Sequence, residues 1–247
     1  MLTEQRHEII LQLLNEKGSI TVSDLKKLLN SSESTIRRDL NTLDEEGYLT
    51  KVFGGAVLKE NVFSSAELSV SQKINVNADE KQSIARYAAK LVVPDDFIYI
   101  DAGTTTEYMI DFLTEKRATY VTNAVTHARK LAVAGFKVIL IGGELKGITE
   151  AVVGNEAIIT LEKMNFNKGF FGTNGISQNR GFTTPDFNEA LVKETAFKHS
   201  HEKYILADSG KFGEISSVTF GDINDAVIIT NNNIPNSFAK LSNVVIV

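Results

Sequence analysis

Four side chains near residue 38 have the types and spacing of groups that bind double-stranded DNA. Arg37 and Arg38 lie within two helical turns of Ser34 and Asn41. At about 100° per residue the four project from one arc of a helix. Guanidinium, amide and hydroxyl groups hydrogen-bond base edges in the major groove and grip backbone phosphates. The pattern predicts a recognition helix, although a plain three-helix unit with a solvated charged face fits the periodicity equally well.

A basic side chain follows this helix in a stretch typical of a β-hairpin. The sequence YLTKVFGGAV alternates around Gly54 and Gly55, which suit a tight turn. Lys51, in the first arm, can reach a backbone phosphate. We therefore expect a small wing beside the recognition helix.

A second candidate site follows the apolar run FIYID, where Gly103 precedes Thr104, Thr105 and Thr106. The next residues are typical of a helix. The turn therefore offers backbone N–H groups, hydroxyls and the positive end of a helix dipole to an anion such as phosphate. It is not a Walker A loop, because no Gly-Lys-Thr/Ser follows, and the chain has no GxGxxG fingerprint. The alternative is an ordinary threonine-rich helix cap.

Polar side chains also follow other apolar runs. Asn123, Asn174 and Lys211 each come just after a predicted strand, and ligands of parallel sheets bind beyond the carboxyl ends of strands. Glu189 and Lys193 are four residues apart on a predicted helix. That spacing fits a weak surface ion pair or a pair directed into the strand-end crevice, and spacing alone favours the surface pair.

The residues that build metal and thiol sites are missing or scattered. The chain has no cysteine, which excludes disulfides, thiol catalysis and cysteine-type zinc sites. His7, His127, His199 and His201 are dispersed along the chain, and the last two diverge on a helix. No GxSxG nucleophile elbow occurs. We expect no metal site and no cofactor.

The composition is that of a folded globular protein. Hydrophobic residues make up 43% of the chain and charged residues 23%, which excludes a disordered chain. No apolar run approaches the roughly 18 residues of a membrane span, and the start MLTEQRHEIILQ lacks signal-peptide features. The net charge of −5 argues against indiscriminate polyanion binding. We expect a cytoplasmic protein with no membrane partner.

Short amphipathic helices would position the first candidate site. Thr21 with Asp24, and then Ser32, have the spacing of helix N-caps, and Gly47 suits a helix end. Helices are predicted at 3–17, 22–29 and 33–46. The second helix is expected to bury Val22, Leu25, Leu28 and Leu29. The third is expected to bury Ile36, Leu40 and Leu43.

An alternation of strands and helices would position the second site. Short runs rich in β-branched residues predict strands at 97–101, 119–123, 137–143, 168–173, 203–208, 225–230 and 243–247. Helices are predicted between most of them, at 78–93, 105–114, 125–134, 154–164 and 186–200. Asn77 and Glu80 are expected to cap the first of these helices. The alternation indicates an α/β domain with a mainly parallel sheet.

The chain therefore divides into three parts. Residues 1–58 are predicted to form a winged helix-turn-helix DNA-binding domain. Residues 59–77 have no steady period and are predicted to be a linker that packs partly on the larger domain. Residues 78–247 are predicted to form the α/β domain.

The run Ser32-x-x-Thr35-Ile36-Arg37-Arg38-Asp39-Leu40, with Arg6, Ile10 and Gly54-Gly55-Ala56, carries a specific resemblance. It resembles the helix-turn-helix signature of the DeoR family of bacterial transcription regulators, which implies binding to operator DNA. Phe53 departs from the pattern, because many members carry His before the Gly-Gly-Ala. We take as DNA-binding residues Ser34, Thr35, Arg37, Arg38, Asn41 and Lys51.

The larger domain resembles the C-terminal sensor domain of the same family, with a fold similar to that of ribose-5-phosphate isomerase. Its turn from Asp101 to Thr106 has the DxGTT-type pattern that holds a sugar phosphate in those proteins. IDAGTTTEYMIDF, GTNG, GFTTPDFNEALVKETA and LADSGKFGEIS resemble the fructose-operon repressors within the family, which implies fructose 1-phosphate as the effector. We take as effector-binding residues Asp101, Gly103, Thr104, Thr105, Thr106, Asn123, Asn174, Glu189, Lys193 and Lys211.

These observations favour a DNA-binding repressor of a sugar operon, relieved by a phosphorylated sugar. One head offers few phosphate contacts, so we expect a homodimer or homotetramer on repeated half-sites. An alternative is a sugar-phosphate isomerase or deaminase in which Glu189 and Asp208 act as acid and base and Lys193 or Lys211 stabilises an enediolate. A third is a sensor domain that has lost its ligand and only oligomerises. The operator, the exact sugar, the oligomer size and the direction of the effector's action are open.

Overall fold

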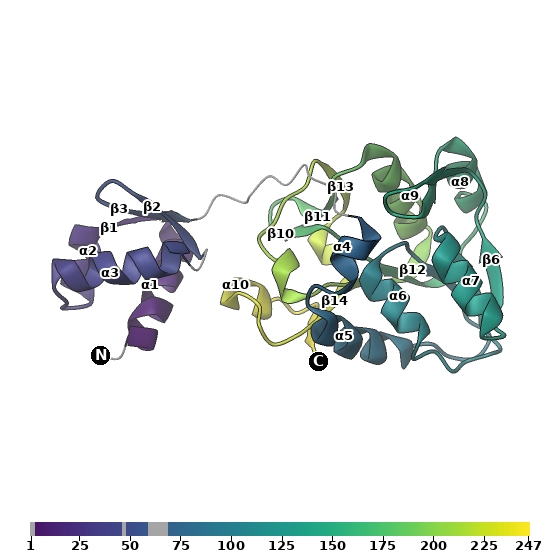
Figure 1. Ribbon diagram of the computed structural model, residues 1–247, viewed down its shortest axis with the longest axis horizontal. Coiled ribbons are helices and arrows are strands. Elements are labelled where there is room, and N and C mark those ends of the chain that lie inside the picture. The colour runs from purple at the N-terminus through teal and green to yellow at the C-terminus, as the bar shows by residue number, and fades with distance from the viewer. Residues whose placement is uncertain (1–2, 46–47, 59–68) are drawn as a thin grey trace. The chain divides into compact units, whose positions relative to one another are not determined.

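The computed structural model describes residues 3–45, 48–58 and 69–247 and divides the chain into two units, residues 1–62 and 63–247. Figure 1 shows both units and labels many of their helices and strands. Each unit has a hydrophobic core of its own.

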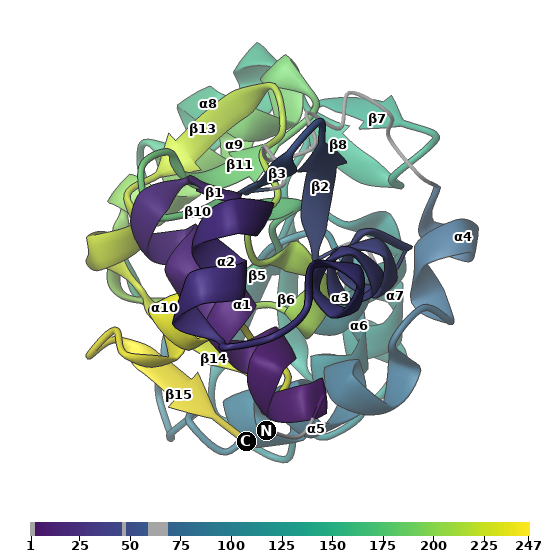
Figure 2. The same cartoon turned by 90° about the vertical axis from the view of Figure 1, so that its left-hand side faces the viewer.

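The described part of the N-terminal unit has three helices and an antiparallel sheet in the strand order β1-β3-β2. Its elements are α1 (Thr3–Lys17), β1 (Ser19–Thr21), α2 (Val22–Leu28), α3 (Glu33–Glu45), β2 (Leu49–Val52) and β3 (Gly55–Leu58). The hairpin of β2 and β3 confirms the predicted wing (Figure 2). The strand β1 was not predicted from the sequence. This strand approaches β3 so closely that a Cβ atom at position 55 would lie 2.2 Å from the Ile20 carbonyl oxygen. Only glycine, which has no Cβ atom, fits there.

The predicted caps of this unit are confirmed. The Thr21 hydroxyl accepts a hydrogen bond from the Asp24 amide at 3.1 Å. The Ser32 hydroxyl accepts one from the Thr35 amide at 3.2 Å. These bonds fix where α2 and α3 begin. The predicted stripe of α3 is buried, namely Ile36, Leu40 and Leu43.

One predicted core residue of α2 is wrong. Leu28 is 57% exposed, whereas Val22, Leu25 and Leu29 are buried. At about 100° per residue, Leu28 lies some 60° outside the arc that the other three share, so it projects into solvent. Gly47, the predicted end of the third helix, lies outside the described residues.

The larger unit is built on a seven-stranded parallel sheet in the order β15-β14-β12-β9-β4-β5-β6. Its strands are β4 (Phe97–Ile100), β5 (Thr119–Thr122), β6 (Lys137–Leu140), β9 (Phe166–Phe171), β12 (Ser200–Leu206), β14 (Val227–Thr230) and β15 (Val244–Ile246). Each of the seven predicted strands supplies one member, so the predicted parallel α/β architecture is confirmed.

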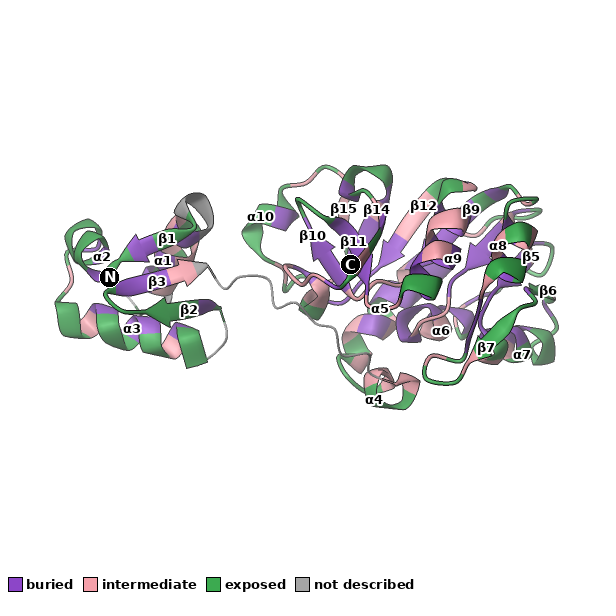
Figure 3. Cartoon of the chain, turned by 90° about the horizontal axis from the view of Figure 1, so that it is seen from above, coloured by how far each residue is buried: buried purple, intermediate pink, exposed green. Residues whose placement is uncertain are grey.

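Alternate residues of the strands face two separate cores. Ile98 and Ile100 of β4 pack in a core shared with α5 (Ala78–Ala89), α6 (Thr104–Ile110) and α7 (Val125–Val133). Tyr99 packs in the other core, shared with α8 (Asn155–Leu161) and α9 (Phe187–Lys198). Covering both faces requires strands that are apolar throughout, and Figure 3 shows this burial.

Several short elements of the larger unit were not predicted. A hairpin joins β7 (Glu144–Lys146) and β8 (Ala151–Val153), and a second sheet has the order β10-β11-β13. Its strands are β10 (Gly175–Ser177), β11 (Gly181–Thr184) and β13 (Val218–Gly221), and the remaining helices are η1 (Ser209–Lys211), η2 (Ile223–Asp225) and α10 (Asn236–Ala239). Each has only three or four residues, too few to show a period in the sequence.

Part of the predicted linker is helical. Ser69 forms a capping box with Gln72 at the start of α4 (Val70–Ile74). The Val70 amide donates to the Ile148 carbonyl at 3.3 Å, and the Tyr108 hydroxyl donates to the Ile74 carbonyl at 3.2 Å. Residues 69–77 therefore lie against the larger unit.

Asn77 is the N-cap residue of α5, as predicted, but its side chain does not cap the helix. Asn77 lies in a left-handed conformation, with φ of 52°, and makes no side-chain cap hydrogen bond. Its amide nitrogen instead donates to the Asp208 carboxylate at 2.8 Å. The Glu80 carboxylate likewise accepts from the Ser209 amide at 3.2 Å. Both side chains therefore contact residues just after the carboxyl end of β12. These contacts were not predictable from the sequence, because the partners lie about 130 residues apart.

Candidate functional site

The outer face of α3 is polar and exposed. Ser34, Arg37, Arg38 and Asn41 are all exposed, and Thr35 is half-buried. Ser34, Arg37, Arg38 and Asn41 lie opposite the buried stripe of the helix, as its periodicity requires. Thr35 lies at the side of the helix, with its hydroxyl 2.8 Å from the Ser32 hydroxyl. Two guanidinium groups, one amide and one hydroxyl therefore face outward from one helix.

Side-chain contacts hold the residues of this face in place but leave its positively charged groups accessible to solvent. Arg37 donates two hydrogen bonds to Glu33, at 2.9 and 2.7 Å, but the two side chains are 51% and 54% exposed. Such a surface pair contributes little and can exchange for a phosphate. The Lys51 ammonium donates to the Asn41 amide oxygen at 2.6 Å, so the wing and α3 present one continuous surface.

A buried ion pair behind this face was not predicted as a contact. The Arg6 guanidinium of α1 binds Asp39 of α3 with two hydrogen bonds, at 2.7 and 2.9 Å. Burial by itself raises the pKa of Asp39, but hydrogen bonding and charge from Arg6 outweigh it and hold this pKa below its usual value. Both residues belong to the motif that carries the family resemblance. They tie α1 to α3 and leave the two arginines that precede Asp39 free to face outward.

At the carboxyl end of β4, Asp101 is buried and anchors the turn that follows. Its Oδ2 accepts a hydrogen bond from the Gly172 amide at 3.1 Å and one from the Lys193 ammonium of α9. Its Oδ1 is buried with no partner among the described residues. Burial raises the pKa of Asp101, against the opposing charge of Lys193. The structure thus brings together two predicted site residues that lie 92 positions apart.

The turn from Gly103 to Thr106 is held by side chains inside it and beside it. The Thr106 hydroxyl donates to the carbonyls of Asp101 and Gly103, at 2.7 and 2.8 Å. The Asn123 side chain accepts from the Ala102 amide at 3.0 Å. Thr106 and Asn123 are therefore positioning residues in this structure. Thr104 and Thr105 are nearly buried at the first turn of α6.

Glu189 and Lys193 do not form a surface pair. They are 7% and 5% exposed. Glu189 accepts a hydrogen bond from the Thr149 hydroxyl and lies 3.4 Å from the Lys146 ammonium, whereas Lys193 turns to Asp101. The interpretation that spacing favoured is wrong, because α9 packs against the strand ends rather than against solvent. Both side chains point into the strand-end region.

The other predicted residues lie further along the sheet edge. Asn174 accepts a hydrogen bond from the Thr184 hydroxyl at 3.3 Å, next to the small second sheet. Lys211 lies in η1, after β12, and no contact with the Gly103 turn is found for it within the described residues. Burial lowers the pKa of Lys81, against the opposing charge of Asp208.

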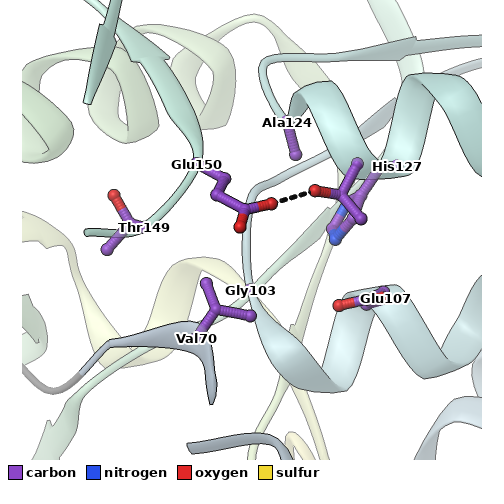
Figure 4. Close-up of a pocket in the computed structure, with 8 residues that line it drawn as sticks. Val70, Gly103, Glu107, Ala124, His127, Thr149 and Glu150 are labelled. Carbon is purple, nitrogen blue, oxygen red and sulfur yellow. Dashed lines mark hydrogen bonds between the residues drawn. The ribbon is translucent and has the colours of Figure 1, made fainter. Parts of the chain in front are cut away.

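A pocket beside the Gly103 turn contains a histidine that the sequence did not single out. Its lining residues are Val70, Gly103, Glu107, Ala124, Thr126, His127, Thr149 and Glu150 (Figure 4). His127 is 3% exposed and lies two residues into α7. The sequence could have indicated His127 by its place shortly after the carboxyl end of the strand at 119–122, because ligands of parallel sheets bind at such ends.

Among residues 3–45, 48–58 and 69–247, no group of three or more histidine, aspartate or glutamate side chains is arranged to hold a metal ion. The helices within the same ranges include none long and apolar enough to cross a membrane.

Comparison with known proteins gives matches along nearly the whole chain. Residues 6–62 match the DeoR-like helix-turn-helix domain, and residues 76–232 match the DeoR C-terminal sensor domain. The chain is 43% identical, over 93% of its length and 91% of the relative's, to a Bacillus subtilis protein named an uncharacterized HTH-type transcriptional regulator FruR. It is 35% identical to the lactose phosphotransferase system repressor of Streptococcus mutans, over 98% and 97% of the two chains.

Among solved structures, ribose 5-phosphate isomerase A of Methanocaldococcus jannaschii matches with a TM-score of 0.41 and 14% identity, over 55% of each chain. The family matches cover both the unit with the exposed arginines and the unit with the Asp101 turn. The chain belongs to the DeoR family of helix-turn-helix transcriptional regulators.

Proposed function

We propose that this protein represses a sugar-utilisation operon and that a phosphorylated sugar, fructose 1-phosphate, releases it from operator DNA. The observation that carries the proposal is the exposed face of α3, where Arg37 and Arg38 project away from the core beside Lys51 of the wing. Guanidinium groups in that position bind phosphates and guanine edges in a major groove. The named repressors among the relatives support the same role.

The chain is a regulator rather than an enzyme, as its helix-turn-helix domain and its relatives indicate. The two carboxylates considered as acid and base are engaged in holding the fold. Asp208 accepts hydrogen bonds from the Asn77 side chain and the Gly210 amide, at 2.8 and 3.1 Å. Glu189 accepts from Thr149. A regulator of this kind acts where its operator is, in the cytoplasm.

We assign the effector's phosphate to the turn from Gly103 to Thr106. Support comes from the hydroxyls of Thr104 and Thr105 at the first turn of α6, and from Lys193 close by on Asp101. Fructose 1-phosphate is the effector that the resemblance of this domain to the fructose-operon repressors implies. The lactose phosphotransferase system repressors among the relatives make a different phosphorylated sugar the main competitor.

Release from DNA requires the effector to favour one arrangement of the protein over another. A coupling free energy of about 1–3 kcal/mol changes operator affinity about 5- to 150-fold. One recognition helix makes few contacts, so we also propose that two or four copies bind repeated half-sites.

The test uses the full chain, labelled operator DNA and a series of sugar phosphates. Fluorescence anisotropy measures operator affinity with fructose 1-phosphate, fructose 6-phosphate or tagatose 6-phosphate added. We expect fructose 1-phosphate to weaken binding at least fivefold, and saturating ligand to raise the melting temperature. If a different phosphosugar releases the DNA, the sugar is wrong and the repressor role stands. If none of them stabilises the protein, the sensor role is wrong.

A further inference from the structure

The pocket beside the Gly103 turn contains groups to which the phosphate assignment gives no role. It lies at the carboxyl ends of β4 and β5 and is lined from α4, α6, the start of α7 and the β7–β8 loop. Segments from distant parts of the sequence therefore converge on one small space next to the turn.

The imidazole of His127 is the least explained group in this pocket. It is 3% exposed, and its Nδ1 has no hydrogen-bond partner among the described residues. Buried polar atoms nearly always have a partner in the protein, in water or in a ligand. Burial lowers the pKa of His127 to about 3, so the ring is neutral at pH 7. A neutral imidazole exchanges hydrogen bonds readily with a hydroxyl group.

The charged groups of the pocket exclude a second phosphate. Glu107 is half-buried and Glu150 lies opposite it, where its carboxylate accepts a hydrogen bond from the Thr126 hydroxyl (Figure 4). Carboxylates repel an anion but accept hydrogen bonds from neutral hydroxyl groups. The combination of two carboxylates, a threonine and a neutral imidazole suits a polyol.

We propose that this pocket binds the hydroxyl-bearing part of a sugar phosphate and that Nδ1 of His127 hydrogen-bonds one of its hydroxyls. The inference rests on the proposed function, which assigns the phosphate of the same ligand to the adjoining turn. Gly103 belongs to both the turn and the pocket lining, so one small ligand reaches both. His127 is then a residue that selects the sugar rather than one that holds the phosphate.

Three replacements of His127 distinguish a hydrogen bond to the sugar from a structural role in holding the Gly103 turn. His127→Asn keeps a polar atom near the place of Nδ1, His127→Gln keeps one near Nε2, and His127→Phe keeps a ring without either. His201→Phe is the matched control, because His201 is exposed. Isothermal titration on the full chain measures Kd for fructose 1-phosphate and for inorganic phosphate, and thermal melts establish that each variant is folded.

We expect His127→Phe and His127→Gln to raise Kd for fructose 1-phosphate about tenfold, equal to about 1.4 kcal/mol. His127→Asn should stay within about threefold of the original protein. His127 also hydrogen-bonds the Gly103 backbone, so the variant that keeps a polar atom near Nε2, His127→Gln, is the one that should leave Kd for inorganic phosphate unchanged.

Other outcomes overturn the inference in distinguishable ways. An equal loss for both probes would mean that the ring only supports the turn. If His127→Phe binds fructose 1-phosphate with an unchanged Kd, the proposed hydrogen bond to His127 is wrong and the proposed function stands. If the original protein binds none of fructose 1-phosphate, fructose 6-phosphate and tagatose 6-phosphate, the proposed function and this inference fail together.

Discussion

In α3, two arginines face outward while the aspartate that follows them turns inward. Asp39 is 3% exposed and accepts both hydrogen bonds of Arg6. A buried charge that loses its partner is costly, because neither water nor another group compensates it. The pair therefore matters to the fold of the DNA-binding unit, and to DNA only through that fold.

Asp39→Asn should destabilise the N-terminal unit clearly more than the control does, because it leaves the Arg6 charge without its counter-charge. Urea denaturation of the full chain, followed at low and neutral pH, measures the loss. Glu45→Gln, at the exposed end of the same helix, is the control and should change stability by less than about 0.5 kcal/mol. Equal stability of the two variants would show that the pair contributes nothing.

His127 should make the larger unit sensitive to acid. Its pKa in the folded protein is lowered to about 3 by burial, against about 6.5 in an unfolded chain. Between these values the unfolded chain binds a proton and the folded chain does not, so stability falls as the pH drops below about 6.5. We expect a loss of about 2–3 kcal/mol from pH 8 to pH 4.5 by urea denaturation. His127→Phe should lack this component, and an unchanged pH dependence in that variant would contradict the assignment.

Among the elements, those with a clear period were predictable and those without one were not. The seven apolar runs all became strands of one parallel sheet. The inner strands are apolar because both of their faces are covered, whereas the edge strand β6 is apolar but largely exposed. The three- and four-residue strands β7, β8, β10, β11 and β13 left no such signal. Their presence is set by tertiary packing, which a single sequence does not display.

The candidate site shows the same limit at longer range. Gly103 and its threonines were recognisable because the turn is local in sequence. The pairing of Asp101 with Lys193 was not, because it spans 92 residues and depends on how α9 packs. Four-residue spacing even suggested the wrong partner for Lys193. Local chemistry was therefore predictable, whereas contacts made by folding were not.

The wing should add one phosphate contact to those of α3. Lys51→Ala is expected to weaken operator binding and to make the slope of log affinity against log salt less negative by about 1, since one fewer counterion is released. Lys163→Ala, an exposed lysine of the larger unit, is the control and should leave the slope unchanged. An unaltered slope for Lys51→Ala would place the wing away from the DNA backbone.

For the whole molecule, the separate cores of the two units predict separable functions. Arg37→Ala should abolish operator binding while fructose 1-phosphate still raises the melting temperature. Thr105→Val should do the reverse, because it removes a hydroxyl from the phosphate turn at nearly constant volume. Anisotropy and thermal shift on both variants provide the measurement. Parallel losses in both assays would mean that the variants merely unfold.

The helix α4 links what the pocket holds to the order of residues 70–74. Five residues are too few for a helix to persist alone, so α4 depends on its contacts with Ile148, Tyr108 and Lys81. One of its residues, Val70, also lines the pocket beside the Gly103 turn. An occupant that displaced Val70 would weaken these contacts, whereas one that packed against Val70 would strengthen them. The protection of the α4 amides against hydrogen exchange is therefore expected to change when the pocket is filled.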